Sequence, residues 1–375
     1  MAVTIDFSEL EQLININSYT KNKTGVDTVA RLYSQWMTQL GFEAQTHQRD
    51  EIGNHVHYRS VRATGPKVLL LGHFDTVFPP GTFEGFSEDK DWVYGPGTCD
   101  MKGGNFVILQ SLRAVKEKLG YLANIDVLMV SDEESGSDDS KHLTAKIATE
   151  YDLCLVFEAA GPDNDVVIER KGIATYQIEL TGKAAHAGNH YADGLNANLA
   201  AAHMLLSLTE LTNLDLGTTV NVGKMKGGIG ANTISPSAVM HVEARFTNNN
   251  EKDRVLTTIE QIANSPKIDG ITTNLSGGLQ RDVMQSSEKQ NDWIRRLELL
   301  TNRRFKLEKR GGVSDANVVS GVGVPTLDGF GPFGDGDHTI HERAKKSSFV
   351  QRIKLVSTIL MNFAGSKTYQ ESNVA

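Results

Sequence analysis

Nearly continuous apolar runs occur three times in the first half of the chain, at residues 68–71, 125–130 and 153–157. Strands that are apolar at every position are typical of a parallel sheet covered by helices on both faces. Between the first two runs, apolar residues recur at helical spacing from Phe106 to Leu119, and Gly120 follows where a helix would end. The order strand, helix, strand predicts an α/β domain with a mostly parallel sheet sandwiched by helices.

The pattern changes after Gly172. Residues 174–181 and 239–246 alternate between apolar and polar, which is typical of strands with one face in water. Helical stretches at 195–211 and 254–262 lie between and after them. We therefore predict an inserted α+β domain of the ferredoxin-like kind, a small antiparallel sheet backed by two helices, at about residues 173–280.

Apolar patterns typical of the first domain return after this insertion. They predict a helix near 293–300, a strand at 324–327 and a final helix at 349–363, and another helix is expected near the start, at 26–40. The first domain is therefore expected to be discontinuous, with residues 1–172 and 281–375.

Composition and charge exclude several functional classes. With 38 basic and 46 acidic residues the net charge is −8, which opposes the phosphate contacts that nucleic-acid binding requires. The start, Met1 to Leu10, has no basic leader or apolar core, and no stretch of 18 apolar residues follows. We expect a soluble cytoplasmic protein with neither a nucleic-acid nor a membrane partner. Since only Cys99 and Cys154 are present, any metal must be held by histidine and carboxylates.

Polar residues that can bind metal follow each of the three apolar runs. They are His73 and Asp75 after the first run, Asp132, Glu133 and Glu134 after the second, and Glu158 after the third. The carboxyl ends of neighbouring parallel strands open on one crevice, so we expect these side chains to meet there. Asp100, in a glycine-rich loop that leads into the next helix, is expected to join them.

Such a cluster of acids requires a cation, because uncompensated buried charges cost several kcal/mol each. Imidazole with carboxylate suits zinc, although manganese or cobalt fits the same ligands, and one carboxylate can bridge two ions. We therefore expect two metals. Asp75, two residues after His73, is placed to orient its imidazole. Of Glu133 and Glu134, which point in different directions if the segment is extended, one can bind metal while the other acts as a general base in amide hydrolysis.

Simpler interpretations exist for some of these residues. Taken alone, the acidic stretch 132–139 is typical of a solvated turn, and His55 and His57 are expected at the surface. His186 and His190 have the spacing of a zinc pair, but their glycine-containing surroundings speak against a metallopeptidase helix.

Six ordered segments together resemble a known family. They are residues 72–76, 95–104, 132–136, 181–188, 230–234 and 311–315. These segments resemble the zinc peptidases that include glutamate carboxypeptidase, aminoacylase and succinyl-diaminopimelate desuccinylase, and the chain looks closest to glutamate carboxypeptidase.

The resemblance implies a role for each site residue. One zinc would be bound by His73, Asp100 and Glu158, and the other by Asp100, Glu134 and His338, with Asp100 as the bridge. Glu133 would be the base and Asp75 the residue that orients His73. On the inserted lid domain, His186 would polarise the scissile carbonyl, often in the partner subunit's site. The substrate carboxylate would be held by Asn232 and Arg245, in a pocket lined by Gly311, Gly312 and Ser314.

The last ligand has a neighbouring alternative, because His341 stands three residues after His338. The family pattern, with a glutamate four residues after the histidine, favours His338.

We expect a di-zinc metallopeptidase that releases a C-terminal amino acid, with glutamate as the first candidate, from an N-acyl or peptidyl substrate. We expect it to be a homodimer formed through the lid domain. Two alternatives are a deacylase of the aminoacylase or desuccinylase type, and a non-catalytic metal-binding or peptide-binding protein on the same scaffold.

Overall fold

A computed structural model describes residues 5–364, which form two compact units. Unit 1 comprises the described residues up to Ile168, Ser286–Arg310 and those from Ser314 onward. Unit 2 comprises Glu169–Gln285 and the short segment Gly311–Val313. Among the helices described, none combines the length and the apolar character needed to cross a membrane.

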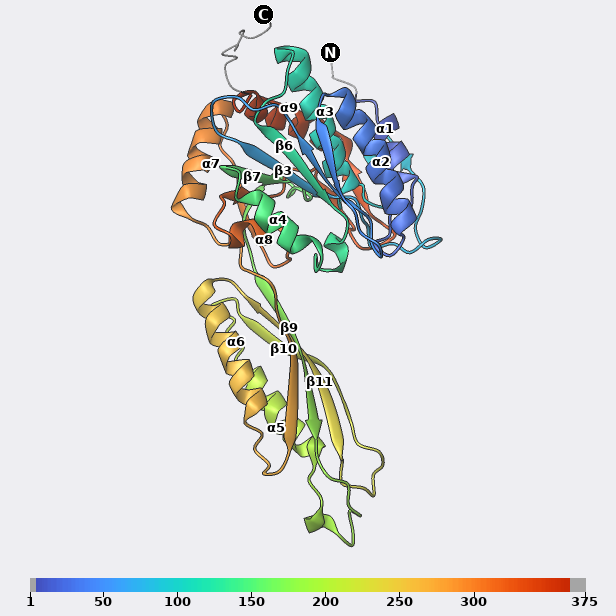
Figure 1. Ribbon diagram of the computed structural model, residues 1–375, viewed down its shortest axis with the longest axis vertical. Coiled ribbons are helices and arrows are strands. Elements are labelled where there is room, and N and C mark those ends of the chain that lie inside the picture. Colours follow the sequence, from blue (N-terminus) through green and yellow to red (C-terminus); the bar gives the residue numbers. More distant parts are fainter. Residues whose placement is uncertain (1–4, 365–375) are drawn as a thin grey trace, which may run out of the picture. The chain divides into compact units, whose positions relative to one another are not determined.

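A six-stranded sheet forms the centre of unit 1 (Figure 1). In spatial order its strands are β1 (Glu43–His47), β2 (His55–Arg59), β6 (Ile125–Val130), β3 (Val68–His73), β7 (Leu153–Val156) and β14 (Thr326–Leu327). The four strands from β6 to β14 are parallel, and β2 and β1 add an antiparallel edge. Every residue of β3, β6 and β7 is buried, as their apolar sequences predict. The predicted α/β class with a mostly parallel sheet is confirmed.

Helices cover this sheet. They are α1 (Ser8–Ile14), α2 (Lys23–Gln39), α3 (Lys102–Leu119), α4 (Ser140–Ala148), α7 (Glu288–Thr301), α8 (Asp315–Gly321) and α9 (Lys346–Met361). Helix α3 packs against α1 and α9, and α4 packs against α8, which contacts β7 and β14 (Figure 1). The core they share with the sheet contains Val68, Leu70, Val127 and Leu155. Gly120 ends α3 in the left-handed conformation expected of a helix-terminating glycine.

Two smaller sheets complete unit 1. One has the order β15 (Gly334–Asp335), β16 (Arg343–Lys345), β5 (Trp92–Tyr94) and β4 (Ser87–Glu88), and it is antiparallel throughout. The other pairs β13 (Leu307–Arg310) with β8 (Val166–Arg170), whose last two residues already belong to unit 2. The first sheet joins two regions that are distant in sequence, because the hairpin at residues 334–345 pairs with the strand that precedes the Asp100 loop.

Unit 2 is a four-stranded antiparallel sheet with two long helices (Figure 1). Its elements are β9 (Gly172–Thr181), α5 (Ala197–Thr209), β10 (Thr219–Gly227), β11 (Ser237–Phe246), α6 (Asn249–Asn264) and β12 (Thr272–Arg281). The spatial order is β10, β11, β9, β12, so the unit has the ferredoxin-like arrangement. Alternate residues of β9 and β11 are buried, and they share a core with α5 and α6.

The expectation that His55 and His57 lie at the surface was wrong. Their side chains are buried, because β2 pairs with β6 on one side and with β1 on the other. Alternation within one short strand could not reveal these two long-range pairings.

Candidate metal and catalytic site

The carboxyl ends of β3, β6 and β7 bring the first polar side chains together. His73 is the last residue of β3 and pairs with Val130, the last residue of β6. The amide of Phe157 donates to Leu71 O, so Glu158 emerges beside the end of β3. A Cβ on Gly104 would lie only 2.1 Å from Phe157 O. Only a glycine therefore lets the start of α3 pack this closely against the end of β7. The Asp100 loop, which leads into α3, is brought close to Glu158 in the same way.

Asp100 lies between two histidines. Its Oδ1 is 3.2 Å from His73 Nε2, and its Oδ2 is 3.3 Å from His338 Nε2. The two oxygens of one carboxylate therefore face two different imidazoles, as a carboxylate that bridges two metal ions requires.

One further glutamate lies beside each histidine. Glu134 Oε2 is 3.2 Å from His338 Nε2, and Glu158 Oε1 is 3.9 Å from His73 Nε2. Both carboxylates are largely buried. We call His73, Asp100, Glu134, Glu158 and His338 the acidic cluster. Within it, ligand atoms of His73, Asp100 and Glu134 all lie within 4.8 Å of one another.

The acidic cluster has the spacing of a metal site. Ligand atoms about 2.1 Å from a tetrahedral zinc ion are about 3.4 Å apart, close to the separations of Asp100 from His73 and His338. Glu134 Oε1 is buried and has no hydrogen-bond partner among the described residues. A buried carboxylate oxygen in that state is destabilising unless a cation binds it. The donor atoms therefore fit divalent metal ions.

Asp75 organises one side of the acidic cluster. His73 Nδ1 lies 3.0 Å from Asp75 O and 3.4 Å from its Oδ1, so the imidazole is fixed with Nε2 toward Asp100. The Asp75 carboxylate also accepts from the amides of Glu133 and Glu134, at 3.3 and 3.2 Å. These two glutamates begin a 3-10 turn, Glu133–Ser135, rather than the extended segment that we had considered. The turn leaves Glu133 partly exposed beside the buried Glu134.

Two residues that hold this side in place were missed by the sequence analysis. Thr20 is buried and donates to Asp75 Oδ2 at 2.7 Å, and Asn105 Nδ2 donates to His73 O at 2.7 Å. A single threonine in a loop carries no recognisable pattern. Asn105 precedes the predicted helical pattern, which begins at Phe106, so the sequence analysis did not single it out.

The histidines of the acidic cluster favour their charged form. Burial lowers the pKa of His73, but hydrogen bonds to Asp100 and Asp75 outweigh it and hold that pKa well above its usual value. Hydrogen bonds to Asp100 and Glu134 raise the pKa of His338 to about 11. Burial acts to raise the pKa of Asp100, yet the two histidines hold it below its usual range.

The two glutamates of the acidic cluster, Glu134 and Glu158, favour their neutral form. Burial raises the pKa of both Glu134 and Glu158 well above the usual value, and the charge of Asp100 raises it further. Protein groups alone therefore compensate Asp100 but leave these two carboxyls favouring the neutral form. Divalent cations would reverse this preference and make both carboxylates available as ligands.

Of the two neighbouring histidines, it is His338 whose Nε2 lies 3.3 Å from Asp100 and 3.2 Å from Glu134. His341 is exposed, and its backbone amide donates to Thr339 Oγ1. His338 has a φ of 61°, in the left-handed region that residues other than glycine seldom adopt. Such backbone strain is found preferentially at functional sites.

Two of the expected substrate-contacting residues lie on neighbouring loops of unit 2. Ala187 donates its amide to Asn232 O, and His186 pairs with Thr233. His186 is exposed, and its Nδ1 accepts hydrogen bonds from the amides of Gly188 and Asn189. Because Nδ1 is an acceptor, the proton of the neutral imidazole is on Nε2, where it can be donated to a ligand.

Arg245 and the two expected glycines also belong to unit 2. Arg245 Nη1 donates to Gly311 O at 3.0 Å, and Nε forms an ion pair with Glu243 at 2.8 Å. Arg170, which is largely buried, donates to Gly312 O at 3.0 Å. Two guanidinium groups therefore hold the Gly311–Gly312 backbone.

Ser314 has a different environment, in unit 1. It caps α8, its hydroxyl donates to Asp328 at 2.8 Å, and its side chain is buried. Its hydroxyl is therefore already engaged within the protein.

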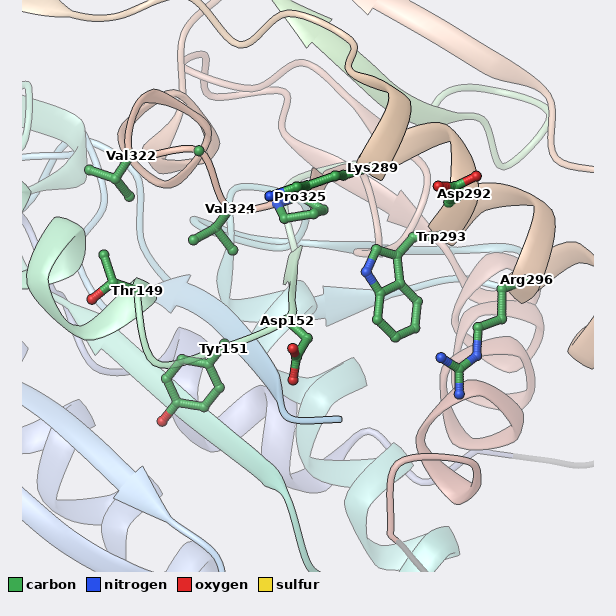
Figure 2. Close-up of a pocket in the computed structure, with 11 residues that line it drawn as sticks. Thr149, Tyr151, Asp152, Lys289, Asp292, Trp293, Arg296, Val322, Val324 and Pro325 are labelled. Carbon is green, nitrogen blue, oxygen red and sulfur yellow. The ribbon is translucent and has the colours of Figure 1, made fainter. Parts of the chain in front are cut away.

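A groove elsewhere in unit 1 is lined by other residues. It has a volume of about 550 Å³, and Tyr151, Trp293, Arg296 and Val322 are among its lining residues (Figure 2). None of its lining residues belongs to the acidic cluster, and Arg296 lies 4.7 Å over the Trp293 ring. Its mixture of charges and lack of convergent acids give no basis for amide hydrolysis.

Comparison with known proteins agrees with this geometry. The model of peptidase family M20/M25/M40 matches residues 69–362. Carboxypeptidase G2 from Pseudomonas sp. (strain RS-16) is 27% identical over 369 residues, which cover 96% of this chain and 89% of that protein. A succinyl-diaminopimelate desuccinylase from Rickettsia bellii (strain RML369-C) is 25% identical, covering 95% of this chain and 97% of the relative.

Solved structures show the same fold. Aminopeptidase PepT from Bacillus cereus ATCC 10987 has a TM-score of 0.77 at 22% identity, and the match covers 95% of this chain and 97% of the other. An M20 family metallo-carboxypeptidase from Sulfolobus solfataricus has a TM-score of 0.71 at 16% identity, covering 96% and 100%. The predicted enzyme class, a metal-dependent hydrolase of amide bonds, is confirmed by the family match. The chain belongs to peptidase family M20/M25/M40.

Proposed function

We propose that this chain is a two-zinc hydrolase that releases a C-terminal amino acid, with glutamate as the first candidate, from a peptidyl or N-acyl substrate. The observation that carries the proposal is Asp100, whose two oxygens face His73 and His338. We assign one metal to His73, Asp100 and Glu158 and the other to Asp100, Glu134 and His338. Cobalt or manganese would fit the same donors.

Each remaining site residue has a task in this proposal. Bound metals would supply Lewis acidity and an acidified water. Glu133, held by the hydrogen bond of its amide to Asp75, accepts the proton of the attacking water and passes it to the leaving amine. His186 donates from Nε2 to the scissile carbonyl.

A free substrate carboxylate distinguishes a carboxypeptidase from an aminopeptidase. We assign its recognition to Arg245 and Asn232, with Gly311, Gly312 and Ser314 near the bound end. Arg245 provides a planar donor that can bind a carboxylate through two hydrogen bonds. The name of the relative carboxypeptidase G2 supports this orientation. Residue 158 is a glutamate, which resembles the carboxypeptidase and deacylase branches of the family, whereas its aminopeptidases usually have an aspartate there.

The two units would have different functions. We propose that unit 1 is the catalytic domain and that unit 2 is the lid and the dimerisation domain. Sedimentation of the full chain measures the second assignment directly, and a monomer at micromolar concentration would contradict it.

A matched substrate panel tests the proposed activity. Metal-loaded protein is incubated with N-acylglutamates, with dipeptides ending in glutamate, and with the same compounds amidated at the C-terminus, and released amino acid is quantified. We expect turnover of the free acids, at least tenfold less for the amides, and none after chelation. Preference for amidated peptides with a free N-terminus would indicate an aminopeptidase. Preference for succinyl or acetyl groups, whatever the C-terminal residue, would indicate a deacylase.

A further inference from the structure

Like Asp75, the buried carboxylate of Glu342 accepts a hydrogen bond from the backbone of a cluster residue, Asp100. Glu342 is 1% exposed. Its Oε2 accepts from Gly97 N at 2.8 Å, and its Oε1 accepts from the amides of Cys99 and Asp100, at 2.9 and 3.0 Å. Three backbone donors from one loop therefore converge on one side chain.

The topology explains why these groups meet. Glu342 immediately precedes β16, which pairs with β5 so that Arg343 lies opposite Tyr94. The Asp100 loop continues from β5, and the turn that carries His338 precedes Glu342 by four residues. Glu342 thereby connects the two loops that carry Asp100 and His338, although 242 residues separate it from Asp100.

We infer that Glu342 is a positioning residue that sets the metal affinity of the half-site formed by Asp100, Glu134 and His338; this inference rests on the proposed two-metal function. Its carboxylate fixes the peptide of Asp100, and with it the direction of Oδ2 toward His338. Side chains that hold metal ligands in this indirect way typically change metal affinity 10-fold to 100-fold when they are replaced. The other half-site shares Asp100, but its His73 is held independently of Glu342, by Asp75 and Asn105, so it should lose less affinity.

The substitution Glu342→Gln separates this role from a general contribution to folding. An amide has nearly the same shape but offers a single acceptor oxygen, so at least one of the three backbone donors faces an NH₂ group. We expect the first cobalt ion to lose less affinity for Glu342→Gln than the second, because His73 keeps its own hydrogen bonds. The second ion should require 10-fold to 100-fold more cobalt.

Cobalt titration followed by the visible absorption of the bound ion measures both half-sites, because the spectrum reports the coordination of each ion. Asp335→Asn is the matched control, since Asp335 lies on the same hairpin but is half exposed and pairs with Arg343. Glu342→Asp keeps the charge, and it should weaken the second site less than Glu342→Gln does.

The outcomes are distinguishable. Wild-type protein that binds no cobalt in the acidic cluster would contradict the proposed function itself. Two wild-type ions with an unchanged titration of Glu342→Gln would overturn only the inference about Glu342. If Glu342→Gln does not fold, Glu342→Asp decides: a weaker second site supports the inference, and a wild-type titration rejects it.

Discussion

A single buried carboxylate near the start of β6 and the carboxylates of the acidic cluster beyond its end differ in how their charge is compensated. Near the start of the strand, Asp126 is fully buried and accepts two hydrogen bonds from Arg62, at 2.8 and 2.7 Å. The Tyr151 hydroxyl donates to it at 2.5 Å and the Ser60 amide at 2.9 Å, and His57 Nε2 lies 3.6 Å away. We call these five residues the Asp126 network. In this network the Arg62 guanidinium and neutral hydrogen-bond donors compensate the charge of one carboxylate, so no bound cation is required.

Beyond the end of β6, the acidic cluster lacks this compensation. Three carboxylates share two histidines, and Glu134 Oε1 has no hydrogen-bond partner among the residues described. The comparison teaches that charge balance, and not the number of acids, separates a structural carboxylate from one that binds metal.

The largest effect is expected from Glu133→Gln. Removing a general base typically lowers turnover by a factor of 10² to 10⁴, so kcat should fall about 10³-fold. Metal content, measured by atomic emission, should stay at two ions, because Glu133 is not a ligand in our assignment. Near-normal turnover would remove Glu133 from the mechanism.

The next effect distinguishes the two neighbouring histidines. His338→Ala should lose one metal ion, and kcat should fall on the order of 10²-fold, as when one electrostatic contributor to a transition state is removed. The matched variant His341→Ala should retain both ions and full activity, because the histidine that lies beside Asp100 and Glu134 is His338. If metal is lost only with His341→Ala, then His341, and not His338, is the metal ligand.

Substitution in the Asp126 network should affect stability and leave metal binding unchanged. Asp126→Asn removes a buried charge opposite Arg62, whose side chain is 37% exposed, and should cost about 2 kcal/mol of unfolding free energy. Denaturant unfolding measures it, with the exposed Asp292→Asn as a control. An equal loss of bound zinc would contradict the separation of the two groups.

A smaller effect should appear with pH. Burial acts to raise the pKa of Asp126, but the nearby His57 and the hydrogen bonds from Arg62 and Tyr151 hold that pKa below its usual range. Its folded pKa is thus below the unfolded value of about 3.9, so its contribution is complete above that pH and declines as pH falls toward the folded pKa. Between pH 5 and pH 3 the wild type should lose more stability than Asp126→Asn. Parallel pH curves would exclude this contribution.

The chemistry at the ends of the buried strands could be predicted from sequence because parallel topology forces it. Once residues 68–71, 125–130 and 153–157 are interpreted as neighbouring parallel strands, the following polar residues must converge. The alternating strands of unit 2 were predictable for a similar reason, since period-two burial is a local property.

The features that could not be predicted from the sequence depend on contacts between distant segments. His55 and His57 are buried by pairing with β6 and β1, and Thr20 reaches Asp75 across 55 residues. The two-residue strand β15 is too short to show a period, whereas β14 lies within the strand predicted at residues 324–327. Arg245 lies on an alternating strand, so only the family resemblance singled it out.

Anomalous diffraction from crystals grown with excess zinc tests the charge-balance account most directly. We expect two zinc peaks, one on each side of Asp100, and none beside Asp126. Zinc beside Asp126, or an acidic cluster that stays free of zinc, would show that charge balance does not determine where this protein binds metal.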